Sequence, residues 1–147
     1  MQIRRATIDD LEELVPLFDS YRQFYKFVSD RNEAREFLQA RLENDESVIF
    51  LAIQDEKPVG FTQLFPSFSS GRMARIYILN DLFVTAEARK SGIGSALMKA
   101  ARAFAESNGA ARLTLSTQIE NETAQCLYER EGWKRDTEFY VYNQALN

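Results

Sequence analysis

A long apolar segment, a basic loop with two glycines and an amphipathic helix follow one another in the middle of the chain. The apolar run Ala74–Val84 predicts a buried strand, which the polar pair Asn80-Asp81 interrupts. Residues 92–107 carry apolar side chains at helical spacing, and residues 112–117 predict a further strand. Two strands joined through a helix lie parallel in one sheet, so this unit favours an α/β fold.

The remaining segments add elements on both sides of this unit. Pro16 lies inside the first helical pattern, where it predicts a kink or an early end. The other expected elements are strands at 3–6, 48–53, 59–65 and 133–142, helices starting near 7, 29 and 121, and a loop at 66–72. This order predicts a mixed central sheet of about seven strands flanked by four helices, in a single domain spanning residues 1–147.

Composition excludes several classes of protein. The chain of 147 residues has a net charge of −4, which disfavours nucleic-acid binding and suits a cationic substrate. It has no histidine, which excludes Ser-His-Asp and Cys-His nucleophile machinery and removes the commonest metal ligand, so we expect no metal. Acid–base chemistry then falls to carboxylates, tyrosine, lysine or water.

The cysteine content and the apolar runs bear on location. Cys126 is the single cysteine, so no internal disulfide forms, and we expect a buried, inert thiol. No apolar run approaches the length of a membrane span, and residues 1–6 contain no signal-peptide segment. These features predict a cytoplasmic protein without a membrane partner.

The segment 84–97 predicts a diphosphate site. Arg89 and Lys90 precede Gly92 and Gly94, which open the amphipathic helix. A helix N-terminus offers free N–H groups and partial positive charge, and glycines allow close approach of a phosphate. A dinucleotide fingerprint would need glycine where Leu97 stands, and a P-loop would need Lys-Ser/Thr after its last glycine. Both alternatives are therefore disfavoured.

The hexapeptide 89–94 matches the pattern Arg/Gln-x-x-Gly-x-Gly/Ala and resembles the acetyl-CoA pyrophosphate loop of the GNAT N-acetyltransferase superfamily. The resemblance extends to residues 80–84 and 121–133 and to the element order. Residues 78–84 are nearest in motif to the small polyamine/histone/D-amino-acid acetyltransferase branch. The resemblance implies a GNAT fold, in which a splayed parallel strand pair holds acetyl-CoA. It also implies acetyl transfer to an amine by direct attack in a ternary complex.

The same resemblance implies a set of cofactor contacts. Backbone groups of Leu82, Phe83 and Val84 would pair with the pantetheine arm. Asn121 would contact that arm as well, although a plain N-cap explains an asparagine at this position equally well. The residues implied to hold the pyrophosphate are Arg89, Lys90, Ser91, Gly92, Ile93, Gly94 and Ser95.

Three residues are candidates for the chemistry. By resemblance, the Tyr128 hydroxyl is the general acid for the leaving thiolate; the alternative is a core tyrosine on an amphipathic helix. Asp81 is the best-placed acid to deprotonate the amine, unless it is a structural carboxylate that binds backbone donors at a bulge. Asn80 departs from the glutamate of the spermidine/spermine enzymes, so it would orient a water rather than accept a proton.

The acceptor side is suggested by aromatic residues after the first helix. Tyr21, Phe24 and Tyr25 would hold an alkyl-ammonium by cation–π contact, or would serve only in helix packing. We expect a small-molecule amine, such as a polyamine or an amino acid. The alternatives are a protein lysine or N-terminus as acceptor, and a non-catalytic acyl-CoA-binding sensor domain. The resemblance also implies a homodimer through residues 139–142.

Overall fold

The computed structural model describes all 147 residues and divides them into two compact units, residues 1–116 and residues 117–147. The first unit holds a five-stranded sheet in the order β1-β2-β3-β4-β5, antiparallel except for the parallel pair β4 and β5. Its elements are β1 (Gln2–Arg5), η1 (Ile8–Asp10), α1 (Leu11–Phe24), α2 (Arg31–Glu43), β2 (Val48–Gln54), β3 (Lys57–Ser69), β4 (Ala74–Val84), η2 (Ala86–Ala88), α3 (Ile93–Ser107) and β5 (Leu113–Thr114).

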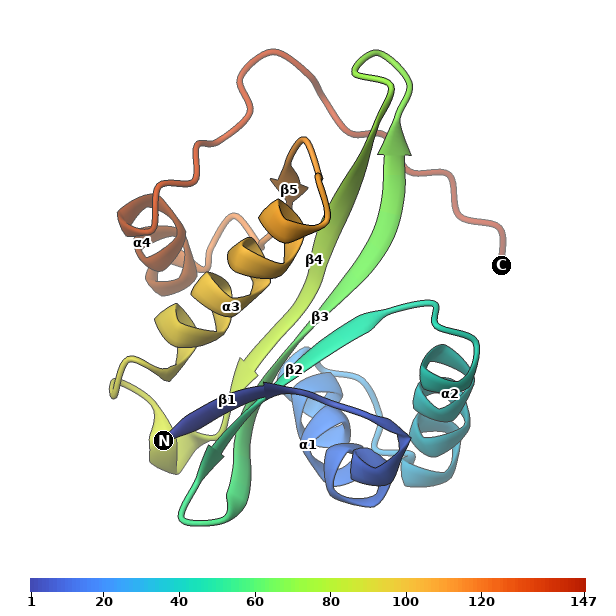
Figure 1. Ribbon diagram of the computed structural model, residues 1–147, viewed down its shortest axis with the longest axis vertical. Coiled ribbons are helices and arrows are strands. Elements are labelled where there is room, and N and C mark those ends of the chain that lie inside the picture. The colour runs from blue at the N-terminus through green and yellow to red at the C-terminus, as the bar shows by residue number, and fades with distance from the viewer. The chain divides into compact units, whose positions relative to one another are not determined.

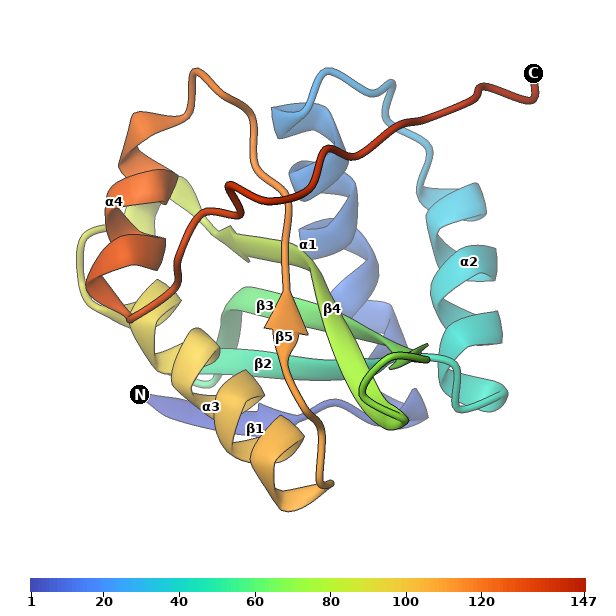
Figure 2. The ribbon, with the colours of Figure 1, turned by 90° about the horizontal axis from the view of Figure 1, so that it is seen from above.

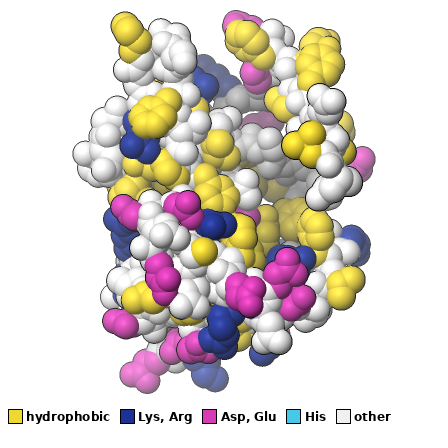
Figure 3. Space-filling model, turned by 90° about the vertical axis from the view of Figure 1, so that its right-hand side faces the viewer, with side chains coloured by type: hydrophobic (Ala, Val, Ile, Leu, Met, Phe, Trp, Pro, Cys, Tyr) yellow, Lys and Arg dark blue, Asp and Glu magenta, His cyan; other side chains and the backbone are white.

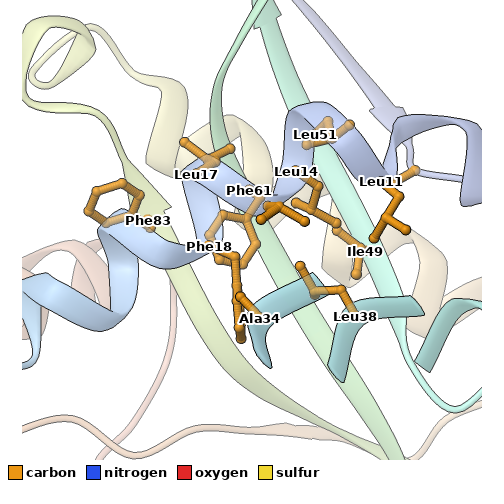
Figure 4. Packing of buried hydrophobic residues seen from close by; sticks show 12 residues of the cluster. Leu11, Leu14, Leu17, Phe18, Ala34, Leu38, Ile49, Leu51, Phe61 and Phe83 are labelled. Atoms are coloured by element: carbon orange, nitrogen blue, oxygen red, sulfur yellow. The ribbon is translucent and has the colours of Figure 1, made fainter. Parts of the chain in front are cut away.

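Helices cover both faces of this sheet. Helices α1 and α2 lie on one face and α3 lies on the other (Figures 1 and 2). Alternate residues of a strand point to opposite faces, so Leu51 of β2 packs with the α1 side while Ala52 packs with the α3 side. The core under α1 gathers leucine and phenylalanine side chains from α1, α2, β2, β3 and β4 (Figure 4).

Local signals explain where the first helices begin. Thr7 forms a capping box with Asp10 ahead of α1, and the Asp30 side chain accepts from the Glu33 N–H at the start of α2. Helix α1 continues through Pro16 to Phe24, so the expectation of an early end was wrong. A proline inside a helix costs about 3 kcal/mol. The buried leucine and phenylalanine residues after it offset that cost.

Helix α2 turns a mixture of charges outward, since Arg and Glu alternate along its sequence. Figure 3 shows Lys and Arg side chains interspersed with Asp and Glu side chains over the lower half of one face of the molecule. Such a mixture produces no large field of one sign over that area.

The sheet differs from the predicted one in strand number and strand length. It has five strands rather than about seven, and β5 has two residues rather than the six expected at 112–117. Residues 66–69 continue β3, where a loop was expected. Strand β2 pairs with β3 only as far as Leu64, so Pro66 lies where β3 has one neighbour, and a proline is tolerated there.

The second unit contains α4 (Glu122–Arg130) and a C-terminal segment without regular structure. The strands expected at 133–142 are absent, because these residues pair with no other strand. Their side chains are largely in solvent, with Phe139 75% and Tyr142 90% exposed. Cys126 is exposed too, so the expectation of a buried thiol was wrong. No helix in the structure is both long enough and apolar enough to span a membrane.

Candidate active site

A bulge in β4 sets the position of the two polar residues that interrupt this strand. Gln63 of β3 lies opposite Asp81, while the next residue, Leu64, lies opposite Leu79. Asn80 is therefore the extra residue of the bulge, and it is exposed to solvent. Asp81 is only 3% exposed. The bulge separates the pair, with one side chain in solvent and the other in the interior.

The Asp81 carboxylate is bound by neutral side chains. Gln63 Nε2 donates to Oδ2 at 2.5 Å, and Asn80 Nδ2 donates to Oδ1 at 3.0 Å. A side-chain hydrogen bond from Tyr21 adds a third donor. Burial raises the pKa of Asp81 above its usual value, and the three hydrogen bonds offset this only in part. None of the groups that shift this pKa is a cation.

These contacts bear on the two interpretations of Asp81, as a base and as a structural carboxylate. A structural carboxylate at a bulge would accept from backbone N–H groups, whereas the donors here are side chains. A buried carboxylate without a cationic partner is costly to keep charged. It is therefore suited to accept a proton or to receive a cation.

The three aromatic candidates lie at the end of α1, and two of them, Tyr21 and Tyr25, interact with this carboxylate. The Tyr21 hydroxyl reaches the Asn80 carbonyl oxygen at 3.4 Å, and its ring packs on Tyr25 with centroids 5.1 Å apart. Phe24 packs on Tyr25 at 5.1 Å and on Phe83 of β4 at 6.3 Å. Burial, together with the negative charge of Asp81, raises the pKa of Tyr25. The end of α1 thus adds an aromatic cluster to the polar group.

The resemblance expects the end of β4 to have an open edge for the pantetheine arm, and β4 has no neighbouring strand along one edge there. Strand β5 pairs only with Tyr77 and Ile78 of β4, whereas β3 pairs with β4 as far as Val84. Residues 82–84 therefore have a strand neighbour on one side only. This open edge fits an extended ligand that pairs with the backbone. The Phe83 side chain points into the core under α1 (Figure 4).

The loop before α3 has the geometry of an anion site. Gly92, the N-cap of α3, adopts a left-handed conformation with φ 82°, and no atom lies within 4 Å of the place where a Cβ would stand. No side chain caps α3, whereas Asp30 and Asn121 cap α2 and α4. The basic residues Arg89 and Lys90 are exposed next to it. Uncapped N–H groups beside two cations fit a pyrophosphate.

Arg89 links this loop to the aromatic cluster. Its Nε donates to the Val84 carbonyl oxygen at 2.9 Å. Its guanidinium lies over the rings of Phe24 and Phe83, at 5.3 and 5.6 Å from their centroids. The remaining loop residues lead into α3. The Ser91 hydroxyl donates to the Ala88 carbonyl oxygen, and Ile93 is buried. Gly94 and Ser95 lie in the first turn of the helix.

The second unit carries the other two candidates. The Asn121 side chain accepts from the Ala124 N–H at 3.2 Å, so it is the N-cap of α4. Tyr128 lies on α4, half-buried, with its ring 6.3 Å from that of Trp133. The capping interpretation of Asn121 is confirmed.

Sequence reasoning missed Gln63, which is fully buried and contacts Asp81 directly. The signal available was a polar pair, Thr62-Gln63, inside an otherwise apolar strand. Such a pair has to find partners in a core, and the strand opposite carried the polar residues Asn80 and Asp81.

Comparison with known proteins identifies the family. A family model described as "Acetyltransferase (GNAT) family" matches residues 14–133, across both units. The chain belongs to the GNAT acetyltransferases. It is 51% identical over 142 residues to the uncharacterized N-acetyltransferase YhfO of Bacillus subtilis, covering 97% of this chain and 95% of that one. A crystal structure of a probable acetyltransferase superposes with a TM-score of 0.95 at 42% identity, covering 100% and 99% of the two chains.

This GNAT chain is therefore an N-acetyltransferase of a family that uses acetyl-CoA. A relative named for its acceptor is more distant. The thialysine N-epsilon-acetyltransferase of Caenorhabditis elegans is 25% identical over 141 residues, covering 90% of this chain and 88% of that protein.

Proposed function

We propose that this N-acetyltransferase acetylates the primary amine of a small cationic molecule, by direct attack of that amine in a ternary complex with acetyl-CoA. The observation that carries the proposal is Asp81, a buried carboxylate with neutral hydrogen-bond donors, beside the aromatic cluster of α1. An alkyl-ammonium satisfies both features, because its charge pairs with the carboxylate and its methylenes contact the rings.

Asp81 has the chemistry of a general base. An alkyl-ammonium has a pKa near 10 and has to lose a proton before its nitrogen attacks. A carboxylate whose pKa is raised by burial takes that proton more readily than an ordinary aspartate does. Asn80 Nδ2 bonds to one carboxylate oxygen, Oδ1, and Gln63 Nε2 bonds to the other, Oδ2. The proton moves from the ammonium nitrogen to a carboxylate oxygen, and the lone pair becomes available.

Other residues hold the donor and the leaving group. Acetyl-CoA supplies the acetyl group as an activated thioester. Residues 89–95 bind the pyrophosphate at the start of α3, and the backbone of residues 82–84 pairs with the pantetheine arm. Asn121 adds a contact to that arm. The Tyr128 hydroxyl holds the proton that the departing thiolate sulfur accepts.

The acceptor class follows from the same groups. A polyamine or an amino acid with a side-chain amine presents a flexible alkyl-ammonium. Thialysine, for which the Caenorhabditis elegans relative is named, is an amine of this kind. Phe24 is 49% exposed and forms the outer part of the aromatic cluster, where an alkyl chain would lie. We infer that Tyr21, Phe24 and Tyr25 contact the acceptor.

The test is CoA-thiol release from acetyl-CoA with a panel of amines. The panel contains spermidine, L- and D-amino acids, thialysine, an aminoglycoside and a lysine peptide. Asp81→Asn and Tyr128→Phe are compared with two variants that make the same chemical changes at exposed positions, Asp55→Asn and Tyr140→Phe. We expect turnover with one class of alkylamine, lowered about 10²-fold or more in the two site variants and unchanged in the controls.

Two results would contradict the proposal. Full activity in Asp81→Asn would remove Asp81 as the base. Binding of acetyl-CoA without thiol release on any amine would favour a domain that binds acyl-CoA without catalysis.

A further inference from the structure

Gln63 is a fully buried polar side chain next to the proposed base. It is 0% exposed, and its Nε2 donates to Asp81 Oδ2 at 2.5 Å. Its other end, Oε1, is buried without a hydrogen-bond partner. A buried acceptor without a partner costs about 1–3 kcal/mol, so an apolar residue would be preferred here if the position served packing alone.

The neighbours of this pair supply no alternative partner. The titratable groups that face Asp81 are Tyr21 of α1 and Tyr25, which follows that helix as its C-cap. Strand β4 contributes the neutral amide of Asn80, and β3 contributes Gln63 itself. Thr62, also fully buried, donates to the Asp81 carbonyl oxygen at 2.8 Å and does not reach the carboxylate.

We propose that Gln63 is a positioning residue that holds Asp81 in both of its protonation states by exchanging the two ends of its amide. The inference rests on the proposed role of Asp81 as the base. While the carboxylate is charged, Gln63 Nε2–H donates to Oδ2. After Asp81 has taken a proton, the Oδ2–H donates to Gln63 Oε1, which until then has no partner.

The exchange is cheap in this environment. It requires a half-turn about the terminal torsion of glutamine, which is broad and roughly two-fold. Oxygen and NH₂ are similar in size, so the surrounding packing is kept. In either orientation one end of the amide bonds to Asp81 and the other end has no partner. The protonation state of Asp81 therefore decides which orientation is occupied.

The consequence is a carboxyl group that keeps one position while it gains and loses a proton. Fixed geometry matters because displacement of a catalytic group by about 1 Å can lower a rate about 10²-fold. Asn80 cannot replace Gln63 in this respect, since it lies in solvent and bonds to the other oxygen.

The first experiment compares Gln63→Met with Thr62→Val. Methionine keeps the length and shape of glutamine but neither donates nor accepts. Valine removes an equally buried hydrogen bond to the same residue without changing the carboxylate. The readouts are the acidic limb of the pH profile of kcat/KM and the ¹³C titration of the Asp81 carboxyl carbon, assigned with Asp81→Asn.

The expected result is an upward shift of both midpoints in Gln63→Met only. Loss of the bond to the charged carboxylate outweighs loss of the weaker bond to the neutral acid, which predicts roughly half a pH unit to one unit. Midpoints in Gln63→Met that coincide with those of Thr62→Val would overturn the proposal.

A second measurement uses the wild-type protein and so does not depend on the folding of a variant. The ¹⁵Nε2 resonance of Gln63 is expected to titrate with the same midpoint as the Asp81 carboxyl carbon. A carboxyl titration that leaves this amide resonance unmoved would refute the exchange. Full activity in Asp81→Asn, by contrast, would refute the role of Asp81 as base while the two NMR titrations still tested Gln63.

Discussion

Gly60 of β3 lies close to both β4 and α3, and replacing it tests the packing behind the proposed cofactor strand. It pairs with Val84 in the β3–β4 ladder. A Cβ at this position would stand 2.9 Å from the Phe83 carbonyl oxygen and 3.3 Å from both Leu97 Cδ1 and Val84 Cγ2. The first of these neighbours is backbone, so Gly60→Ala has to move β4 or α3.

The size of the effect follows from two opposing contributions. Overpacking a core costs about 1–3 kcal/mol, while removing a glycine stabilises by about 0.4–1 kcal/mol through the unfolded chain. The net loss is about 1–2 kcal/mol, which lowers Tm by roughly 2–8 °C in a chain of this length. Because the Phe83 backbone belongs to the proposed pantetheine-binding edge, the Kd for acetyl-CoA should rise as well.

Gly71→Ala is the matched control for this prediction. Gly71 is exposed, and nothing lies within 4 Å of a Cβ built there. Only the contribution of the unfolded chain remains, so its Tm should stay the same or rise slightly. Thermal unfolding by circular dichroism and calorimetric titration with acetyl-CoA measure both quantities. A Gly60→Ala protein as stable as Gly71→Ala, with unchanged affinity, would refute the steric reasoning.

Three further predictions concern the loop and the connection between α1 and α2. Gly92→Ala puts a side chain at φ 82° in open space, so it should cost about 1–2 kcal/mol of stability from backbone strain and weaken acetyl-CoA binding in a calorimetric titration. Arg89→Ala should raise the Kd for CoA about 10-fold through loss of a charge-assisted contact, while a pantetheine without pyrophosphate, measured in parallel, should bind as before. Burial pushes the pKa of Asp19 upward, but hydrogen bonds from Ser29 Oγ at 2.6 Å and the Asp30 N–H at 2.9 Å outweigh it and lower that pKa overall. Asp19→Asn should therefore lower the free energy of unfolding in urea by about 1–3 kcal/mol at pH 7. This loss should stay constant above pH ~4, the pKa of an unfolded aspartate. It should shrink as the pH falls through the lower pKa of Asp19 in the folded protein.

Helix positions, including the glycine start of α3, were predictable from the sequence because their causes are local. The apolar spacing of residues 93–107 and the glycine at 92 gave α3 and its start. A helix was expected to start near residue 29, where Asp30 caps α2, and Asn121 caps α4 as a plain N-cap would. A helix satisfies its backbone within one segment, so a single segment is enough to predict it.

Strand ends were less predictable because a strand needs a neighbour. Residues 112–117 and 133–142 both carry alternating or β-branched sequence, yet only two residues of the first pair with β4 and none of the second pairs at all. Residues 66–69 resemble a turn in composition but are paired with 74–77 across the hairpin. In each case the outcome depends on the partner strand, which the segment itself does not encode.

The candidate site depends on a register change that composition does not reveal. Residues two apart on a regular strand share a face, so Leu79 and Asp81 would point the same way. Leu79 lies opposite Leu64, whereas Asp81 lies opposite the adjacent residue Gln63, so the two side chains are on opposite faces. The extra residue Asn80 produces this reversal.

The reversal is what brings the carboxylate to the proposed acceptor side. Tyr77, two residues before Leu79, packs on Phe104 of α3, with ring centroids 5.4 Å apart. Without the bulge, Asp81 would follow that alternation and point toward α3, away from Tyr21 and Tyr25. The bulge turns Asp81 to the α1 face, next to the aromatic cluster, while Leu82 and Val84 pack on the α3 side. One inserted residue thus places the proposed base beside the proposed acceptor surface, on the strand that carries the proposed cofactor edge.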